Sequence, residues 1–312
     1  MSLPASRAQA GRQSGRARLR IDLFTDPACP FAFSHEPVRW RLRWLYGDAL
    51  AWRPRMIGLA DSVAEMEARG LTPARLARVR ATLAEQHGMP IALEEADRLH
   101  PTRLAALAVV GTRLGAPGRV ERILRALRVL AMAGTAIDEP QALAAAARAS
   151  ALRPADVLQW TRTRRTARAL KREMAAARDP APAARALPEG LARSTRGVVR
   201  YTAPSYVLRG PGGSVFIIPG FRAAEVYETA IANLLPDVKR RPAPEHATTV
   251  LGWARQPLAT MEVAAVLGVD AEEARRRLQS SAVFHPAGSD GYWTLPLGDA
   301  ARVRPASWNT GL

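Results

Sequence analysis

The chain has 312 residues, of which 48% are hydrophobic, and a formal net charge of +17 at neutral pH. Its length indicates about two or three folding units of an ordinary globular protein, and no apolar run approaches the roughly 20 residues that would span a bilayer, so no membrane partner is expected. The single cysteine excludes an internal disulfide framework and favours a cytoplasmic location.

The positive charge is almost entirely arginine, because Lys171 and Lys239 are the only lysines. The arginines are spread over most of the predicted helices and do not form one block. Such a dispersed charge lacks the clustered footprint of a phosphate-binding surface. We therefore expect a solvated basic surface, and a nucleic-acid partner is not favoured.

The N-terminal segment begins with a basic stretch, residues 1–17, that has no apolar periodicity and predicts a disordered tail. It also lacks the apolar core of a secretory signal. The elements predicted next are a strand over 18–25, a helix that ends at Tyr46 and a second strand over 50–59. Trp40 and Trp44, which are one helical turn apart, are expected on the inner face of the helix.

The first strand leads directly into Cys29-Pro30. Proline is favoured at the first position of a helix, so Cys29 should occupy the N-cap. Unpaired backbone N–H groups and the positive end of the helix dipole would stabilise a thiolate there, which predicts a lowered thiol pKa and a reactive nucleophile. The alternative is that Cys29 is a small buried apolar residue, as lone cysteines often are. Pro37 should kink the helix.

From 61 to about 178 the apolar pattern is almost wholly helical, and the proline-rich segment 179–188 ends it. Asp138 is the expected N-cap of a helix over 139–150. The elements predicted afterwards are strands over 201–208 and 215–218 joined by a Gly-rich hairpin turn at 210–213, a helix over 221–235 and a proline-rich linker over 236–245. Because the gap between the strand-containing halves is too long for a loop, this plan predicts an α/β fold interrupted by an inserted helical domain.

Ala203-Pro204 opens the strand that follows the insertion, where a cis proline would lie beside the thiol. Together these pieces resemble the DsbA-like (FrnE-type) branch of the thioredoxin superfamily. The matching stretches are FTDPACPF, RWRLRWLYGD, LAWRPRMIGL, HPTRLAALAV and TAPSYVL, in an order that covers roughly residues 18–235. The resemblance implies a thioredoxin-like domain over 18–60 and 198–235, an all-helical insertion over 61–197, and thiol–disulfide oxidoreduction as the usual activity. Cys29 would be the nucleophile and Pro204 the cis proline.

The departure from the family is Ala32, which stands where the second, resolving cysteine belongs. Three interpretations remain. Cys29 works as a monothiol, in mixed disulfides with a low-molecular-weight thiol or with a protein or peptide partner. The site binds a glutathione-like thiol for a transferase or isomerase, as in the related kappa-class enzymes. The third interpretation is a non-catalytic adaptor, a branch that the pattern EP…WLYGD also resembles.

An apolar groove is predicted between the insertion and the thiol. Pro30, Phe31 and Ala203 are its expected substrate-binding residues, with Phe31 partly exposed and Phe33 turned into the core. An extended peptide or an apolar small molecule that carries a thiol or an anion would suit such a groove.

The other titratable residues near the thiol are weaker candidates. His35 is six residues from Cys29 on a different helix face, so no acid–base pair is expected. Glu36 is either a buried proton carrier or, more simply, an exposed partner of Arg39 or Arg43. The remaining histidines lack ligand spacing, so neither a metal nor another cofactor is expected.

Residues 246–304 predict a separate unit that resembles a winged helix-turn-helix, with Thr260 and Asp270 as N-caps of two helices and a strand–turn–strand after them. The second helix would present Glu272 and Glu273 to DNA, and phosphates would repel them. We therefore expect a wing that packs against the thioredoxin-like domain or a partner, with DNA binding as the less favoured alternative.

Overall fold

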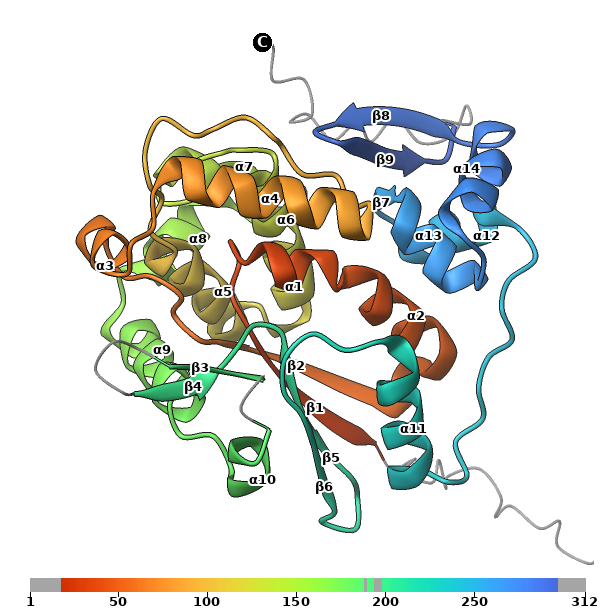
Figure 1. Cartoon of the computed structure of the whole chain (residues 1–312), viewed down its shortest axis with the longest axis horizontal. Helices are drawn as coiled ribbons and strands as arrows, with labels where there is room; N and C mark the ends of the chain where they lie inside the picture. The colour runs from red at the N-terminus through yellow and green to blue at the C-terminus, as the bar shows by residue number, and fades with distance from the viewer. Residues whose placement is uncertain (1–17, 188–189, 194–197, 297–312) are drawn as a thin grey trace, which may run out of the picture.

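The computed structural model describes residues 18–187, 190–193 and 198–296, so the predicted tail 1–17 and the end of the C-terminal unit, 297–304, lie outside the described residues. A four-stranded sheet in the order β2-β1-β5-β6 forms the centre (Figure 1). Its strands are β1 (Leu19–Thr25), β2 (Leu50–Met56), β5 (Ser205–Arg209) and β6 (Val215–Ile218). β1 runs parallel to β2 and antiparallel to β5, which confirms that the strands on either side of the helical segment share one sheet.

Alternation along β1 gives the sheet two different faces. Leu19, Ile21 and Leu23 are buried against α2 (Glu36–Tyr46) and α11 (Ala224–Leu234). The opposite face carries Phe24 and leads to the thiol, as described below. Antiparallel pairing of β5 with β6 confirms the predicted Gly-rich hairpin between them.

The helix that was predicted to run to Tyr46 is two helices, α1 (Pro30–Ser34) and α2, which meet at His35. Pro37 explains the break, because proline has no N–H to donate and its ring crowds the preceding turn. The sheet strand β2 ends at Met56, earlier than predicted, and short 3₁₀ turns occupy Gly47–Ala49 and Pro117–Arg119.

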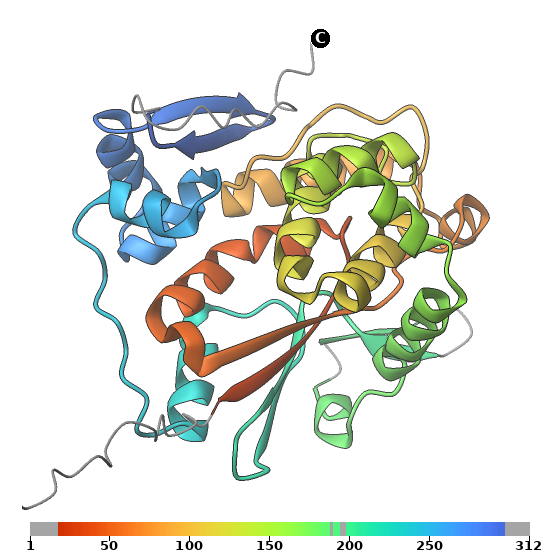
Figure 2. The same ribbon diagram turned by 180° about the vertical axis from the view of Figure 1, so that it is seen from behind.

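Residues 63–185 form a block of helices beside the sheet (Figures 1 and 2). The helices are α3 (Val63–Ala68), α4 (Pro73–His87), α5 (Arg103–Gly115), α6 (Val120–Met132), α7 (Pro140–Ala149), α8 (Pro154–Thr161), α9 (Arg164–Ala177) and α10 (Pro182–Arg185). Ile123, Leu124 and Leu127 of α6 are fully buried in their shared core. None of the helices in the described ranges is long and apolar enough to cross a membrane.

Two details of this block differ from the predictions. α7 has Glu139 as its N-cap, whereas the predicted cap Asp138 accepts a hydrogen bond from Arg98. The predicted strand over 201–208 is two strands, β4 (Val199–Tyr201) and β5, and β4 pairs with a further short strand, β3 (Leu191–Arg193).

The C-terminal elements are α12 (Ala247–Ala254), β7 (Leu258–Ala259), α13 (Thr260–Leu267), α14 (Ala271–Gln279), β8 (Val283–Ala287) and β9 (Asp290–Thr294), with a sheet order of β7-β9-β8. Asp270 caps α14 as predicted, whereas α13 is capped at Ala259, whose backbone N–H is bound by the Glu262 carboxylate. Thr260 is therefore the first residue of the helix and not its cap.

The C-terminal elements pack against α2 (Figure 1). Trp40 and Trp44 are buried, but against α12 and α13 and not against the sheet. Trp40 Nε1 donates to Glu262 at 3.1 Å, and Trp44 Nε1 donates to the Pro242 carbonyl at 2.8 Å. Both tryptophans are therefore buried, as predicted, but the C-terminal helices cover them and the sheet does not.

Candidate functional site

Cys29 is the N-cap of α1, with extended backbone angles (φ −76°, ψ 113°) and Pro30 at the first helical position. Its Sγ lies 3.4 Å from the carbonyl oxygen of Ala203, to which the thiol donates, although 174 residues separate the two in sequence. The peptide bond between Ala203 and Pro204 is cis. The structure thus brings together the two segments that the sequence singled out, one before the insertion and one after it.

The thiol is buried, with 5% of the residue exposed. It belongs to a small apolar cluster that covers it from both the sheet and the segment after the insertion: Phe24, Ala32, Ile57, Tyr201, Ala203 and Val207. Phe24 and Tyr201 stack with their ring centroids 4.6 Å apart. Tyr201 ends β4, so the small β3–β4 hairpin helps to cover the sulfur.

The prediction of a lowered thiol pKa is wrong for this state of the protein. Burial raises the pKa of the Cys29 thiol to about 11, and the neighbouring Asp26 carboxylate raises it further. Hydrogen bonding to the backbone at Ala32 and Phe31 lowers the pKa, as expected at a helix N-terminus, but this effect is smaller than the loss of hydration. The thiol is therefore protonated at neutral pH.

Asp26 is a site residue that the sequence reasoning missed. It is fully buried, and its carboxylate accepts hydrogen bonds from Ala28 N (3.0 Å), Leu59 N (2.9 Å) and Thr102 Oγ1 (3.0 Å). Burial raises the pKa of Asp26 despite these bonds. The sequence did offer a signal: Asp26 directly follows a buried strand and lies three positions before the cysteine. This position is also compatible with a solvated turn, so the sequence alone did not show that Asp26 is buried.

These features can be compared with known proteins. No protein-family profile and no curated protein sequence matches the chain. Among solved structures, it is similar to a candidate protein disulfide isomerase from Nitrosomonas europaea, with a TM-score of 0.52 and 16% identity over 70% of this chain and 98% of that one. The chain has a DsbA-like thioredoxin fold.

Weaker likenesses extend to other thioredoxin-fold proteins. The cytosolic disulfide reductase DsbM from Pseudomonas aeruginosa has a TM-score of 0.47 and 15% identity over 70% of this chain and 98% of its own, and it has also been solved with glutathione. A 2-hydroxychromene-2-carboxylate isomerase has a TM-score of 0.44 and 13% identity over 69% of this chain and 95% of its own.

The aromatic residues of α1 in this thioredoxin fold lie as predicted. Phe31 is 44% exposed, whereas Phe33 is fully buried in the core shared with the insertion. Pro30 is partly exposed beside Phe31, and Ala203 is buried against the thiol. The substrate-binding role of these residues stays a prediction.

The predicted groove beside the thiol stays a prediction, since Cys29 is buried within its apolar cluster. A cavity of about 840 Å³ lies instead on the sheet face next to Phe24, Tyr201 and Val207, and it opens toward the exposed Phe216 of β6. Cys29 does not line it.

The two titratable residues after α1 have structural roles. His35 is buried, with Nδ1 2.9 Å from Tyr206 Oη and Nε2 3.0 Å from the Arg222 carbonyl, so it does not pair with Cys29, as predicted. Burial lowers the pKa of His35 to about 4. No group of three or more His, Cys, Asp or Glu within the described ranges could hold a metal ion.

The predicted pairing of Glu36 with Arg39 is present, but the expectation that Glu36 is exposed is wrong. Glu36 is 2% exposed and forms ion pairs with Arg39 (2.5 Å) and with Arg128 of the insertion. Although burial raises its pKa, the surrounding arginines outweigh burial and lower the pKa of Glu36 to about 2. It stays ionised and joins α2 to α6.

Two arginines bind the loop that follows β2, and a third, Arg200, interacts electrostatically with both of them and with Cys29. Arg178 donates to the Ile57 carbonyl at 3.0 Å, and Arg69 donates to the Leu59 carbonyl at 2.5 Å. Burial lowers the pKa of Arg200, the charges of Arg69 and Arg178 lower it further, and the charges of Cys29 and Asp26 act in the opposite direction. Arg200 therefore interacts electrostatically with Asp26 and with the thiol, whereas the largest charge effect on the thiol pKa comes from Asp26.

The arginine run of α14 is neutralised by neighbouring acids. Arg275 pairs with Asp290, and Arg276 and Arg277 both pair with Glu273. Ser289, in the turn between β8 and β9, exchanges hydrogen bonds with the backbone of Ile91 in the insertion. The turn therefore packs on the insertion, whereas the wing was expected to pack on the thioredoxin-like domain or on a partner.

Proposed function

We propose that the chain is a thiol–disulfide oxidoreductase that works as a monothiol through Cys29. The observation that carries this proposal is the position of the thiol, at the N-cap of α1 and in contact with Ala203 before the cis Pro204. The DsbA-like thioredoxin fold supports it. Since Ala32 takes the place of a resolving cysteine, an external thiol must complete the cycle.

The chemistry takes two exchange steps. The Cys29 thiol loses its proton to water, and the thiolate attacks a low-molecular-weight disulfide, forming a mixed disulfide and releasing one thiolate. A second low-molecular-weight thiolate then attacks the mixed disulfide, which regenerates Cys29 and forms a new disulfide. The protein is unchanged, and the two small molecules have exchanged their redox states.

The partner that we propose is an anionic thiol such as glutathione. Arg69 and Arg178 bind the loop after β2, and Arg200 interacts electrostatically with both of them and with Cys29, so the three could supply positive charge to a bound ligand. A carboxylate bound there would gain charge-assisted hydrogen bonds. Displacing the Tyr201 hairpin would then expose Cys29 to the bound disulfide, which accounts for a resting thiol that is both buried and protonated.

A non-catalytic adaptor is the second candidate, and the burial of Cys29 favours it. With a pKa of about 11, the thiol is ionised at neutral pH in far fewer molecules than a free cysteine with a pKa of about 8.5. In that case the exposed Phe31 would serve a partner protein and the thiol would only fill the core.

We also propose the domain division made from the sequence, and a cytoplasmic location. The thioredoxin-like domain takes 18–60 and 198–235, the insertion 61–197, and a winged-helix-like unit 246–304. The described element order of that unit, helix–strand–helix–helix–strand–strand, supports the last assignment. A single cysteine in a reducing compartment needs no disulfide partner.

A comparison of two rates tests the proposed function. For wild type, the rates of reaction with oxidised glutathione and with neutral iodoacetamide are measured, and their ratio is divided by that of free cysteine at the same pH. Both reactions require the thiolate, so the ratio of the glutathione rate to the iodoacetamide rate does not depend on the fraction of Cys29 that is ionised. We call the ratio for the protein, divided by that for free cysteine, the normalised ratio. We expect iodoacetamide to react roughly a hundredfold more slowly than with free cysteine, but the normalised ratio to exceed one by about tenfold, since each charge-assisted bond contributes that order.

Arg178→Gln should lower the normalised ratio, whereas Arg148→Gln, which removes an exposed charge on α7, should not. A normalised ratio of one in wild type would support the adaptor. So would equal effects of the two variants, because the arginines would then only add to the general charge.

A further inference from the structure

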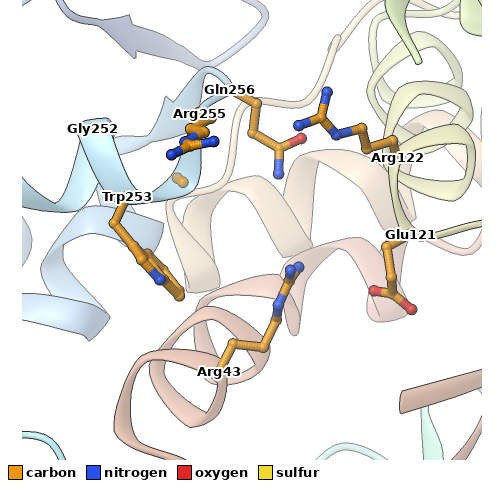
Figure 3. Close-up of a pocket in the computed structure, with 8 residues that line it drawn as sticks. Arg43, Glu121, Arg122, Gly252, Trp253, Arg255 and Gln256 are labelled. Atoms are coloured by element: carbon orange, nitrogen blue, oxygen red, sulfur yellow. The ribbon is translucent and has the colours of Figure 1, made fainter. Parts of the chain in front are cut away.

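A second cavity, of about 410 Å³, lies where α2, α6 and the end of α12 meet, and Cys29 is not part of its lining (Figure 3). Its lining is made of Arg43, Glu121, Arg122, Gly252, Trp253, Ala254, Arg255 and Gln256. Each of the three parts of the chain therefore contributes one arginine. Cavities that bind small molecules start near this size.

The three arginines are not neutralised. Within the part of the chain that the structure describes, no ion pair joins Arg43, Arg122 or Arg255 to a carboxylate. Glu121 is the one acid of the lining, and its Oε2 is bound by Arg39. In contrast, the buried arginines nearby, Arg39 among them, all have carboxylate partners. The lining therefore has three arginines and one acid, and Glu121 offsets only part of its positive charge.

The Arg43 guanidinium lies in the wall of the cavity, against an aromatic ring. Its guanidinium lies 4.8 Å from the centre of the Trp40 ring, and Figure 3 shows it reaching from α2 into the space below Gln256. Burial lowers the pKa of Arg43; the Glu121 carboxylate raises it in part, and the positive charge of Arg39 lowers it. A bound anion would relieve this repulsion.

Arg255 occupies a backbone conformation that favours glycine. It follows α12 with φ 52° and ψ 35°, in the left-handed region, and its N–H bonds to the Leu251 carbonyl. Glycine or asparagine normally takes this helix-ending position, because a side chain there is strained. An arginine in this conformation destabilises the protein relative to glycine. Its side chain lines the cavity.

We propose that this cavity binds a small organic anion that carries phosphate or carboxylate groups. Arg43, Arg122 and Arg255 would bind its oxygens, and Gln256 and Trp253 would contact the rest. Since the three arginines come from three parts of the chain, such a ligand binds only to their assembled arrangement and stabilises it. The site does not involve Cys29 and is independent of the proposed oxidoreductase function.

Binding of inorganic pyrophosphate and of citrate to the full chain tests the proposal, by calorimetry and thermal shift at an ionic strength matched with sodium chloride. We expect saturable binding of at least one of them, and their relative affinity separates phosphate from carboxylate ligands. Arg122→Gln and Arg255→Gly should each weaken it by about tenfold. Arg148→Gln, on exposed α7, should leave it unchanged.

Arg255→Gly also controls for folding. Glycine fits the left-handed conformation, so the variant should melt at the same temperature as wild type or higher without ligand. The proposal is overturned if neither anion binds, if Arg148→Gln weakens binding as much as the cavity variants do, or if a short DNA duplex binds through these arginines while both small anions fail.

Discussion

The buried ion pairs that attach the C-terminal unit lead to a quantitative prediction for Glu262→Ala. The Glu262 side chain is fully buried, and its carboxylate accepts from Arg125 (2.6 Å to Nη2), Ala259 N (2.8 Å) and Trp40 Nε1 (3.1 Å). Breaking a buried pair by removing one partner typically costs about 3–5 kcal/mol.

The structure narrows this range. Arg125 keeps Glu36 at 3.9 Å, so its charge is not left wholly unpaired, which favours the lower end. The Trp40 N–H loses its acceptor in a buried site, which adds about 1 kcal/mol or more. We therefore expect Glu262→Ala to lower the free energy of unfolding by about 4 kcal/mol.

Urea denaturation followed by tryptophan fluorescence measures this change, because Trp40 reports on the same interface. Glu272→Ala is the matched control. Its ion pair with Arg276 is exposed, with 84% of the Glu272 side chain accessible, so the change should stay below about 0.5 kcal/mol. A loss of less than about 1 kcal/mol for Glu262→Ala would refute the reasoning, since an exposed or replaceable carboxylate would behave in that way.

Two further predictions concern the phenylalanines of α1 and the loss of stability at low pH. Phe31→Ala should leave the melting temperature nearly unchanged, whereas Phe33→Ala should lower the free energy of unfolding by about 3–5 kcal/mol, because the first side chain is 44% exposed and the second fully buried; similar losses in thermal denaturation would contradict this. On acidification, the unfolded chain protonates His35 below about pH 6.5, while the folded pKa is lowered to about 4, so stability should fall between these values. Glu36, with a folded pKa lowered to about 2, stabilises the protein above its unfolded pKa of about 4.3, and that contribution is lost as the pH falls from there toward 2. Melting temperatures measured from pH 7 to 3 that stay flat would show that neither group is buried as described.

The sequence was sufficient where local patterns decide the structure. Proline at the first helical turn placed Cys29 at the N-cap by short-range geometry. The position of Pro204 beside it, across the 174 residues that separate Cys29 from Ala203, came with the resemblance to the thioredoxin superfamily. The exposure of Phe31 and the burial of Phe33 followed from their positions in the first turns of α1.

Tertiary burial decided what the sequence could not. The sign of the thiol pKa shift was wrong because the cover over Cys29 includes Tyr201, which is remote in sequence. Asp26 looked like a turn residue, and its burial depends on Thr102 in the insertion. Glu36 looked exposed for a similar reason, because its partner Arg128 lies 92 residues away. A pattern of helix faces does not reveal such partners.

The most direct test of the central claim is turnover. The protein is added to a mixed disulfide of glutathione with a chromogenic aromatic thiol, together with reduced glutathione. Each turnover consumes one glutathione thiolate, forms oxidised glutathione and releases one chromogenic thiolate, whose absorbance is followed above the uncatalysed rate. The account predicts multiple turnovers for wild type, one glutathione adduct at Cys29 detected by intact mass during the reaction, and neither in Cys29→Ser. Wild type and Cys29→Ser proceeding at the same rate, with no adduct on either, would contradict it.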